Sequence, residues 1–113
     1  MKTINEVELE TGISAYTIRY YDKCGFFRNL ARTSQGRRRF SETDVQRLLL
    51  IDALRKSGLS IDGLKNIAPK LDDESYREEI IALCNQRMTA MMIQMEDLQD
   101  CMNRLKHFID SKV

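Results

Sequence analysis

The stretch S-A-Y-T-I-R-Y-Y-D-K, residues 14–23, decides the fold prediction for this chain of 113 residues. Wound as an α-helix at about 100° per residue, it separates into two unlike faces. Ser14, Ile18 and Tyr21 fall on one face, and the other carries aromatic, hydroxyl and cationic groups from Tyr16, Arg19, Tyr20 and Lys23. A helix with only a structural role seldom presents such a mixture to water, so this face is predicted to contact a polyanion.

The residues before this stretch predict a helix-turn-helix. Thr3 to Glu6 has the spacing of a capping box, so a first helix is expected to run to about Glu10. Gly12 suits a tight turn between two short helices, and Ser14 is a good N-cap because its hydroxyl accepts a bond from a free backbone N–H. The helix after Ser14 is then the half of the motif that enters the DNA major groove.

The charge distribution also indicates nucleic-acid binding. The net charge of +1 is the sum of a basic segment in the first half of the chain and an acidic segment at its end. Residues 14–40 contain seven Lys or Arg against one acid, Asp22, whereas residues 72–113 contain five basic and nine acidic side chains. Such asymmetry is typical of proteins that bind nucleic acid. The residues alone also allow an alternative without DNA binding. The two adjacent tyrosines would then be half-buried packing residues, and the run of arginines would only be solvated.

A β-hairpin, or wing, is predicted after this helix, which should stop at Cys24-Gly25. Phe26-Phe27 is expected to start one extended segment and Arg37–Phe40 to supply another, with turn residues at 33–36 between them. Because side chains alternate along a strand, Arg38 shares a side with Phe40 and leans over the edge of the core. We expect the wing arginines to contact phosphates, which add affinity without sequence information.

Two further helices are predicted to form a scaffold. Ser41 to Asp44 resembles a second capping box and opens a helix through Lys56. Ser60 caps a short helix that ends before Pro69.

The last forty residues predict a long helix that pairs with a second copy. Apolar residues recur in alternating steps of three and four, an unbroken a/d pattern over four heptads. They are Ile81, Cys84, Met88, Met91, Met95, Leu98, Met102, Leu105 and Ile109. A chain this small cannot bury such a stripe alone, so the simplest partner is the same helix of another subunit. Ile80, Met92, Cys101 and Phe108 widen the stripe, and the partner's DNA-binding domain is one candidate to meet them.

No metal, cofactor or catalytic group is predicted. Cys84 and Cys101 lie 17 positions apart, roughly 25 Å on a straight helix, and cannot bind one ion within a chain. Methionine at heptad positions is usually adaptable core packing. No paired acid and base, nucleophile or ligand cluster suggests an enzyme. Without an apolar run of about 18 residues or a signal peptide, we expect a cytoplasmic protein with no membrane partner.

Two motifs resemble a known family. T-G-I-S-x-x-T-I-R-Y-Y-D (residues 11–22) and G-R-R-R-F-S-E-x-D-V (residues 36–45) are similar to the DNA-binding domain of the MerR family of bacterial transcription regulators, over roughly Ile4 to Ala68. The resemblance implies a winged helix-turn-helix that binds a pseudo-palindrome in a promoter as a dimer with antiparallel long helices. It also implies bending and underwinding of the promoter spacer for RNA polymerase.

The resemblance further implies which residues contact DNA and where this chain departs from the pattern. Tyr16, Thr17, Arg19 and Tyr20 would contact DNA from the helix, and Arg37 and Arg38 from the wing. Arg37 replaces a common aromatic residue. Glu8 stands where a small alanine is usual, which puts the packing of the first helix in doubt. The segment Phe27-Arg28-Asn29 lacks the usual prolines.

These inferences define one overall prediction. The fold is mainly α: a winged helix-turn-helix DNA-binding domain in residues 1–70, followed by a coiled-coil dimerisation helix in residues 72–113. The function is that of a homodimeric, sequence-specific DNA-binding transcription regulator acting at a promoter. The alternatives are an architectural or excisionase-like DNA-binding protein and a protein-interaction adaptor in which the long helix is the functional part.

Overall fold

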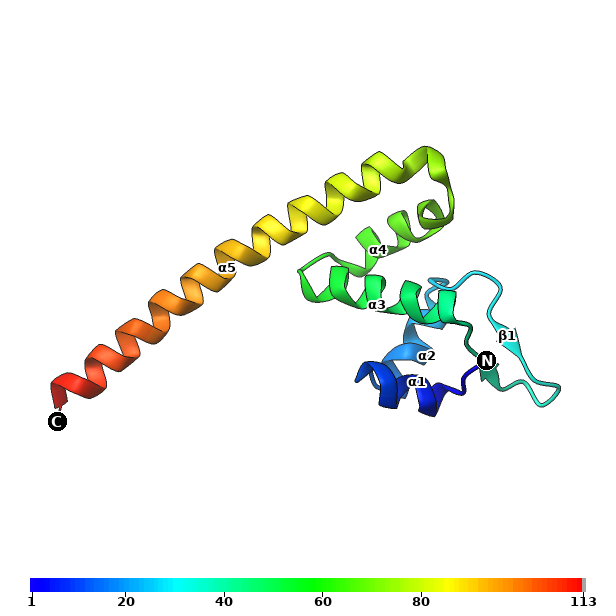
Figure 1. Ribbon diagram of the computed structural model, residues 1–113, viewed down its shortest axis with the longest axis horizontal. Coiled ribbons are helices and arrows are strands. Elements are labelled where there is room, and N and C mark those ends of the chain that lie inside the picture. The colour runs from blue at the N-terminus through cyan, green and yellow to red at the C-terminus, as the bar shows by residue number, and fades with distance from the viewer. Residues whose placement is uncertain (113) are drawn as a thin grey trace.

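The computed structural model describes residues 1–112 and has two parts of different shape (Figure 1). Residues 1–72, which we call the head, form four short α-helices, a hairpin and a short 3-10 helix. A single long helix, α5 (Arg77–Lys112), leads away from the head, and the whole structure measures 65 × 34 × 21 Å. The mainly helical fold agrees with the prediction.

The first two helices form the predicted helix-turn-helix. Helix α1 (Ile4–Thr11) begins with a complete capping box: the Thr3 hydroxyl accepts from the Glu6 N–H, and the Glu6 carboxylate accepts from the Thr3 N–H. Gly12 ends this helix at φ 74°, in the left-handed region. Helix α2 (Ala15–Lys23) begins at Ser14, whose hydroxyl accepts from the Thr17 N–H.

The wing is present, but its first strand lies later in the chain than predicted. Strands β1 (Ala31–Arg32) and β2 (Arg38–Arg39) pair in antiparallel fashion, with a turn between them at residues 33–36. The prediction of an extended segment starting at Phe26-Phe27 was wrong. Phe26 is instead buried, with its ring centroid 5.7 Å from that of Tyr21, because the core needs this aromatic side chain.

Helix α3 (Glu42–Lys56) crosses the centre of the head, followed by α4 (Ile61–Ile67) and the 3-10 helix η1 (Ala68–Asp72). The predicted caps at Ser41 and Ser60 are both formed. The core takes apolar side chains from every helix of the head and from the end of the wing. Its largest completely buried side chains are those of Ile18, Phe26, Phe40, Leu48, Ile51 and Leu64.

Arg47 of α3 joins three segments of the head. Its guanidinium donates to the backbone carbonyls of Phe26 and Ala68 and to the carboxylate of Asp72, the last at 2.9 Å. The Arg47 side chain is only 10% exposed. It therefore ties the segment after α2 and the end of α4 to α3.

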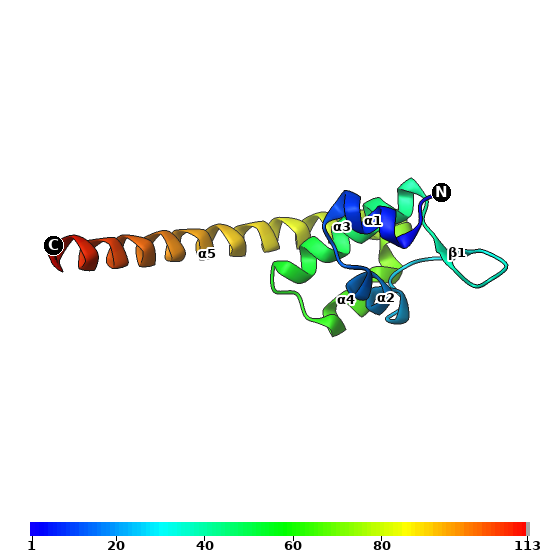
Figure 2. The same ribbon diagram turned by 90° about the horizontal axis from the view of Figure 1, so that it is seen from below.

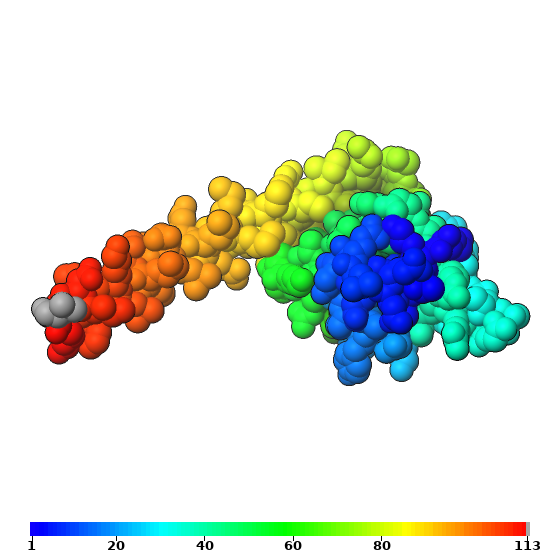
Figure 3. Space-filling view, turned by 60° about the horizontal axis from the view of Figure 1, so that its bottom comes forward, coloured from blue at the N-terminus to red at the C-terminus, as the bar shows by residue number. Residues whose placement is uncertain are grey.

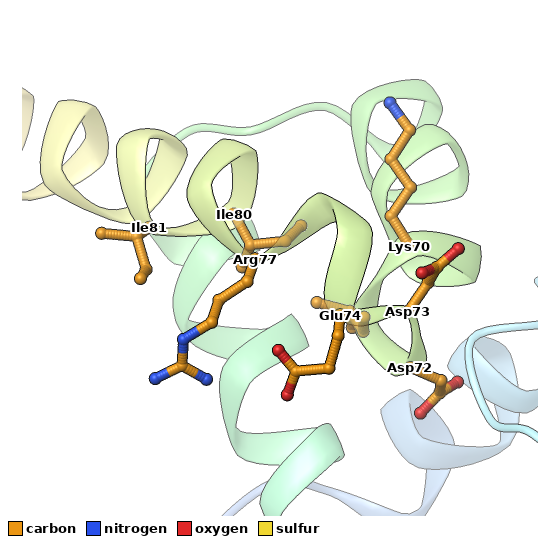
Figure 4. A pocket seen from close by; sticks show the side chains of 8 residues that line it. Lys70, Asp72, Asp73, Glu74, Arg77, Ile80 and Ile81 are labelled. Atoms are coloured by element: carbon orange, nitrogen blue, oxygen red, sulfur yellow. The ribbon is translucent and has the colours of Figure 1, made fainter.

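A corner between the head and α5 is formed by η1 and a second 3-10 helix, η2 (Glu74–Tyr76). Its side chains are largely charged and line an open hollow (Figure 4). Lys70 forms an ion pair with Glu79 of α5 at 2.9 Å, and its ammonium lies 5.1 Å from the centre of the Tyr76 ring. These contacts link the end of the head to the first turn of α5.

Beyond this corner α5 contacts the head only along its first half, as far as Met91. Ile80 and Leu83 pack against the core, and Arg87 donates to the hydroxyl and carbonyl oxygens of Ser57 at the end of α3. From about residue 92 the helix projects away from the rest of the chain (Figures 1 and 2). The last residue of the predicted segment, Val113, lies outside the described residues.

Candidate nucleic-acid interface

Helix α2 presents two faces that match the prediction. Ile18 and Tyr21 are buried in the core, whereas Tyr16, at 79%, and Tyr20, at 44%, are exposed. Arg19 and Lys23 lie on the same exposed face, and Thr17 is half-buried beside them. The packing alternative for the tyrosines therefore applies to Tyr21 alone. A continuous surface of phenolic and cationic groups is available for contact with a ligand.

Tyr21 and Asp52 fix α2 to α3 from below this surface. The Tyr21 hydroxyl donates to the Asp52 carboxylate at 3.1 Å, and the same carboxylate pairs with Lys56 at 2.8 Å. Burial, together with the negative charge of Asp52, raises the pKa of Tyr21 to about 12. The exposed Tyr20 also has a raised pKa, chiefly through a hydrogen bond with the Cys24 side chain.

Glu8 caps the beginning of α2 from the preceding helix. Its carboxylate accepts a hydrogen bond from the backbone N–H of Ala15, the first residue of α2. An anion is favourable there because the first N–H groups of a helix are unpaired and carry partial positive charge. The sequence left the packing of α1 at Glu8 in doubt. The structure shows that the larger side chain joins the two helices of the motif.

Three arginines of the wing lie in different environments. Arg37 is exposed, and Arg39 is half-buried. Arg38, with a side chain only 19% exposed, donates from Nε to the carboxylate of Asp22 on α2 at 2.7 Å. Arg32 of β1 reaches the same Asp22 oxygen at 3.0 Å. Arg38 is thus partly covered through its pairing with α2, and Asp22 is the side chain that holds the wing against α2.

A basic hollow connects the wing with α2 and the start of α1. It is lined by Arg19 from α2, by residues 36–39 of the wing and by residues 3–5 of the chain. Lys2 secures this arrangement because its backbone N–H and carbonyl pair with those of Phe40, both at 2.8 Å. The fold thus places Arg19 and Arg37 at the same hollow, although they are separated by 18 positions in the chain.

The predicted seam on α5 is exposed to solvent. Cys84 and Met91 are half-buried, and the other seven a/d residues are at least 48% exposed, up to 69% for Met95. No side chain of α5 is fully buried within the described part of the helix. A stripe of large apolar groups in water is unfavourable, and such stripes mark interaction sites.

Several residues that shape this site were not found from the sequence. Arg47, Arg87, Asp22 and Glu8 act through partners between 7 and 30 positions away. No local pattern marks such pairs. Among residues 1–112, no cluster of three or more His, Cys, Asp or Glu side chains is arranged to hold a metal ion. No helix of that part of the chain is both long and apolar enough to cross a lipid bilayer.

The fold and the basic surface define a winged helix-turn-helix DNA-binding protein. The family model described as MerR HTH family regulatory protein matches residues 2–71, which is more than half of the chain. The chain therefore belongs to the MerR family.

Curated relatives support this membership. An uncharacterised HTH-type transcriptional regulator of Haemophilus influenzae is 39% identical over 77 residues, 66% of this chain and 57% of that relative. The chain thus spans little more than half the length of this relative. The regulator ZntR of Escherichia coli is 26% identical over 98% of this chain and 80% of its own length.

Solved structures give the same result. HiNmlR, described as a MerR family regulator lacking the sensor domain and bound to promoter DNA, superimposes with a TM-score of 0.82 at 31% identity, over 90% of this chain and 78% of its own. A MerR family regulator from Bacillus thuringiensis reaches 0.84 at 25% identity, over 97% of both chains. These relatives are transcription regulators, which assigns this chain to DNA-binding transcription regulation and not to an enzyme class.

Proposed function

We propose that the chain acts as a homodimer that binds a pseudo-palindromic operator within a promoter. Two subunits pair through antiparallel α5 helices, and each head places α2 in a major groove. The observation that carries this proposal is the pairing of an exposed cationic and aromatic face on the head with an exposed apolar seam on α5. The promoter-bound structure of HiNmlR supports the promoter as the target.

Roles for the individual side chains follow from their positions. Arg19 and Tyr20 project from the middle of α2 and Tyr16 from its first turn, and these three side chains contact base edges. Thr17 and Lys23 contact the flanking backbone of the DNA. Arg37 projects freely from the wing and contacts phosphate. Arg38 is held by Asp22 through Nε, and its terminal nitrogens donate no hydrogen bond within residues 1–112, so they remain for a phosphate beside the wing.

Regulation by DNA distortion is the proposed mechanism. A dimer that grips both half-sites bends and underwinds the promoter spacer, so that RNA polymerase engages both promoter elements. Such distortion costs up to several kcal/mol, which many phosphate contacts offset. The basic hollow between Arg19 and the wing supplies groups for these contacts.

Footprinting with the purified protein on genomic fragments selected by binding tests this proposal. We expect protection of a two-fold symmetric site centred in a promoter spacer, with enhanced cleavage at its centre where the helix is distorted. The alternative of an architectural protein predicts arrays of protected sites outside promoters. A binding constant that does not change over a few-fold rise in salt would contradict DNA binding through these residues, because several phosphate contacts make affinity steeply salt-dependent.

A further inference from the structure

An apolar hollow lies where α5 leaves the head. It is lined by Leu50, Ala53 and Leu54 of α3 and by Cys84, Met88 and Met91 of α5, with Ser57 and Arg87 at its edge. Its volume is about 140 Å³. A cavity of about 150 Å³ accommodates one benzene ring, so the hollow has room for one large apolar side chain. Three of the residues that line the hollow, Cys84, Met88 and Met91, belong to the seam. A helix that pairs with the seam therefore also lies beside α3.

We propose that this hollow receives the other end of α5 from the second subunit, with the partner's Phe108 inserted beside Leu50. This inference rests on the dimer of the proposed function and specifies its contacts. Phe108 is 60% exposed in the single chain and belongs to the last turns of α5. The far end of this helix lies well away from its own head (Figure 3). The Phe108 ring can therefore fill the hollow only when the two belong to different chains.

The side of the seam on which Phe108 lies supports this assignment. It occupies the heptad position directly before the seam residue Ile109, and Arg87 occupies the equivalent position before Met88. Arg87 points to the head, where it donates to Ser57. In an antiparallel pair these flanking positions of both helices lie along the same side of the seam. The partner's Phe108 therefore lies on the side of the head.

The seam pattern leaves few possible registers. When two copies of α5 run antiparallel, the residue numbers of any two residues that face each other add up to the same value, and this sum defines the register. Because the seam repeats every seven residues, another register that keeps seam against seam changes the sum by seven. A sum of 193 pairs Cys84 with the partner's Ile109, Met88 with the partner's Leu105, Met91 with the partner's Met102 and Met95 with the partner's Leu98. A sum of 193 sets Ile81 opposite the partner's Lys112, a sum of 186 sets Ile109 opposite the partner's Arg77, and a sum of 200 sets Met88 opposite the partner's Lys112. Each of these registers thus places one seam residue opposite a cation.

The three registers differ in the distance along the paired α5 helices between the points where the two heads are attached. The head is attached to α5 around residue 85, midway between Leu83 and Arg87. With a sum of 193, this position faces residue 108 of the partner, so the two attachment points lie 23 positions apart, about 35 Å at 1.5 Å per residue. Consecutive half-sites on B-DNA are about 34–36 Å apart. A sum of 186 gives about 24 Å and a sum of 200 about 45 Å, so 193 is the sum at which the distance between the attachment points matches the half-site spacing.

Cross-linking tests the docking and the register directly. Cys24 and Cys101 are replaced by Ser and Cys84 by Ala, and the variant is checked for dimer mass and DNA binding. In this background L50C/F108C is expected to form a disulfide-linked dimer on oxidation, and M88C/L105C to do the same. The matched control L49C/F108C should remain unlinked, because Leu49 is exposed and does not line the hollow.

The alternatives give different cross-links. Linking of M88C/L98C but not of M88C/L105C would show a sum of 186 and overturn the register, and dimers of L105C alone would show parallel helices. If none of the pairs links while sedimentation still shows a dimer, the docking is wrong and the proposed dimer stands. A monomer in the unmodified protein would instead overturn the proposed function.

A pair of substitutions without cysteine provides an independent measurement. F108A is expected to weaken dimerisation about 10- to 100-fold, as for a central aromatic residue of an interface, whereas H107A, on the outer face, should leave the dissociation constant unchanged. L50A should have a similar effect, and the double variant L50A/F108A should be less than additive because both changes remove one contact. Additive effects would show that the two side chains do not meet.

Discussion

The head and α5 solve the burial of apolar side chains in opposite ways. The head encloses residues such as Ile18, Phe40 and Leu64 completely within one chain. Helix α5 has a comparable supply of large apolar residues and fully buries none of them in its described part. The core of the head is completed by Ile80 and Leu83 from the beginning of α5, whereas the seam further along α5 is left for the second subunit of the proposed dimer. In the proposed function, the head recognises DNA and α5 assembles the dimer.

The largest expected effect comes from M95K, which breaks only the assembly part. The Met95 side chain lies at the centre of the seam and is 69% exposed in the single chain. A lysine at this position would carry its charge into the interface when the helices pair. Leaving such a charge unpaired in an interface costs several kcal/mol, so sedimentation should give a monomer at concentrations where the unmodified protein is a dimer. E96K, on the outer face, is the matched control. An unchanged mass for M95K would show that the seam lies elsewhere.

The reciprocal change, R47A, breaks only the recognition part. It removes the hydrogen bonds that a nearly buried guanidinium donates to two backbone carbonyls and to the Asp72 carboxylate. We expect the free energy of unfolding of the head to fall by about 3 kcal/mol. R28A is the control, because Arg28 is exposed and lies 3.9 Å from the same Asp72. Equal melting temperatures of the two variants would contradict the role of Arg47.

A finer division is expected inside the recognition surface. R19A should lose about 1–3 kcal/mol of preference for the operator over random DNA, because Arg19 is assigned to base edges. R37A and R38A should weaken operator and random DNA together and reduce the salt slope of binding by about one. Titrations of both DNAs at several salt concentrations separate the two kinds of effect. Identical behaviour of R19A and R37A would remove the distinction.

The smallest effect is a change of stability with pH in the head. The folded-state pKa of Tyr21, about 12, exceeds its ordinary value of 10.0. Its contribution to stability is therefore complete below pH 10 and is lost as the pH rises from 10 to about 12. Chemical denaturation across this range should show a decline for the unmodified protein that is weaker in Y21F. A decline of the same size in Y21F would assign it to other groups.

The sequence predicted well whatever depends on neighbouring residues. The caps at Thr3, Ser14, Ser41 and Ser60 and the two faces of α2 were found because partners lie within one or two helical turns. The seam residues were found to be apolar and regular, and the structure shows them exposed in the single chain; their pairing remains a proposal.

The errors and omissions involve distant contacts. Phe26-Phe27 has a composition typical of a strand, but the Phe26 side chain is buried in the core. Strand β1 begins only after Asn29, whose φ is 53°. The ion pairs of Asp22 with Arg32 and Arg38 depend on how the wing folds back over α2. The roles of charged side chains in a small head are therefore known only when the tertiary structure is known.

The bond from Arg87 to Ser57 has a consequence for how operators are chosen. It fixes the angle between α5 and α3 at the point where the long helix leaves the head. In the proposed dimer, the length of α5 between Arg87 and the midpoint of the helix then sets the distance between the two heads. Relatives with one heptad more or less in that stretch would measure a different gap and select promoters of another geometry.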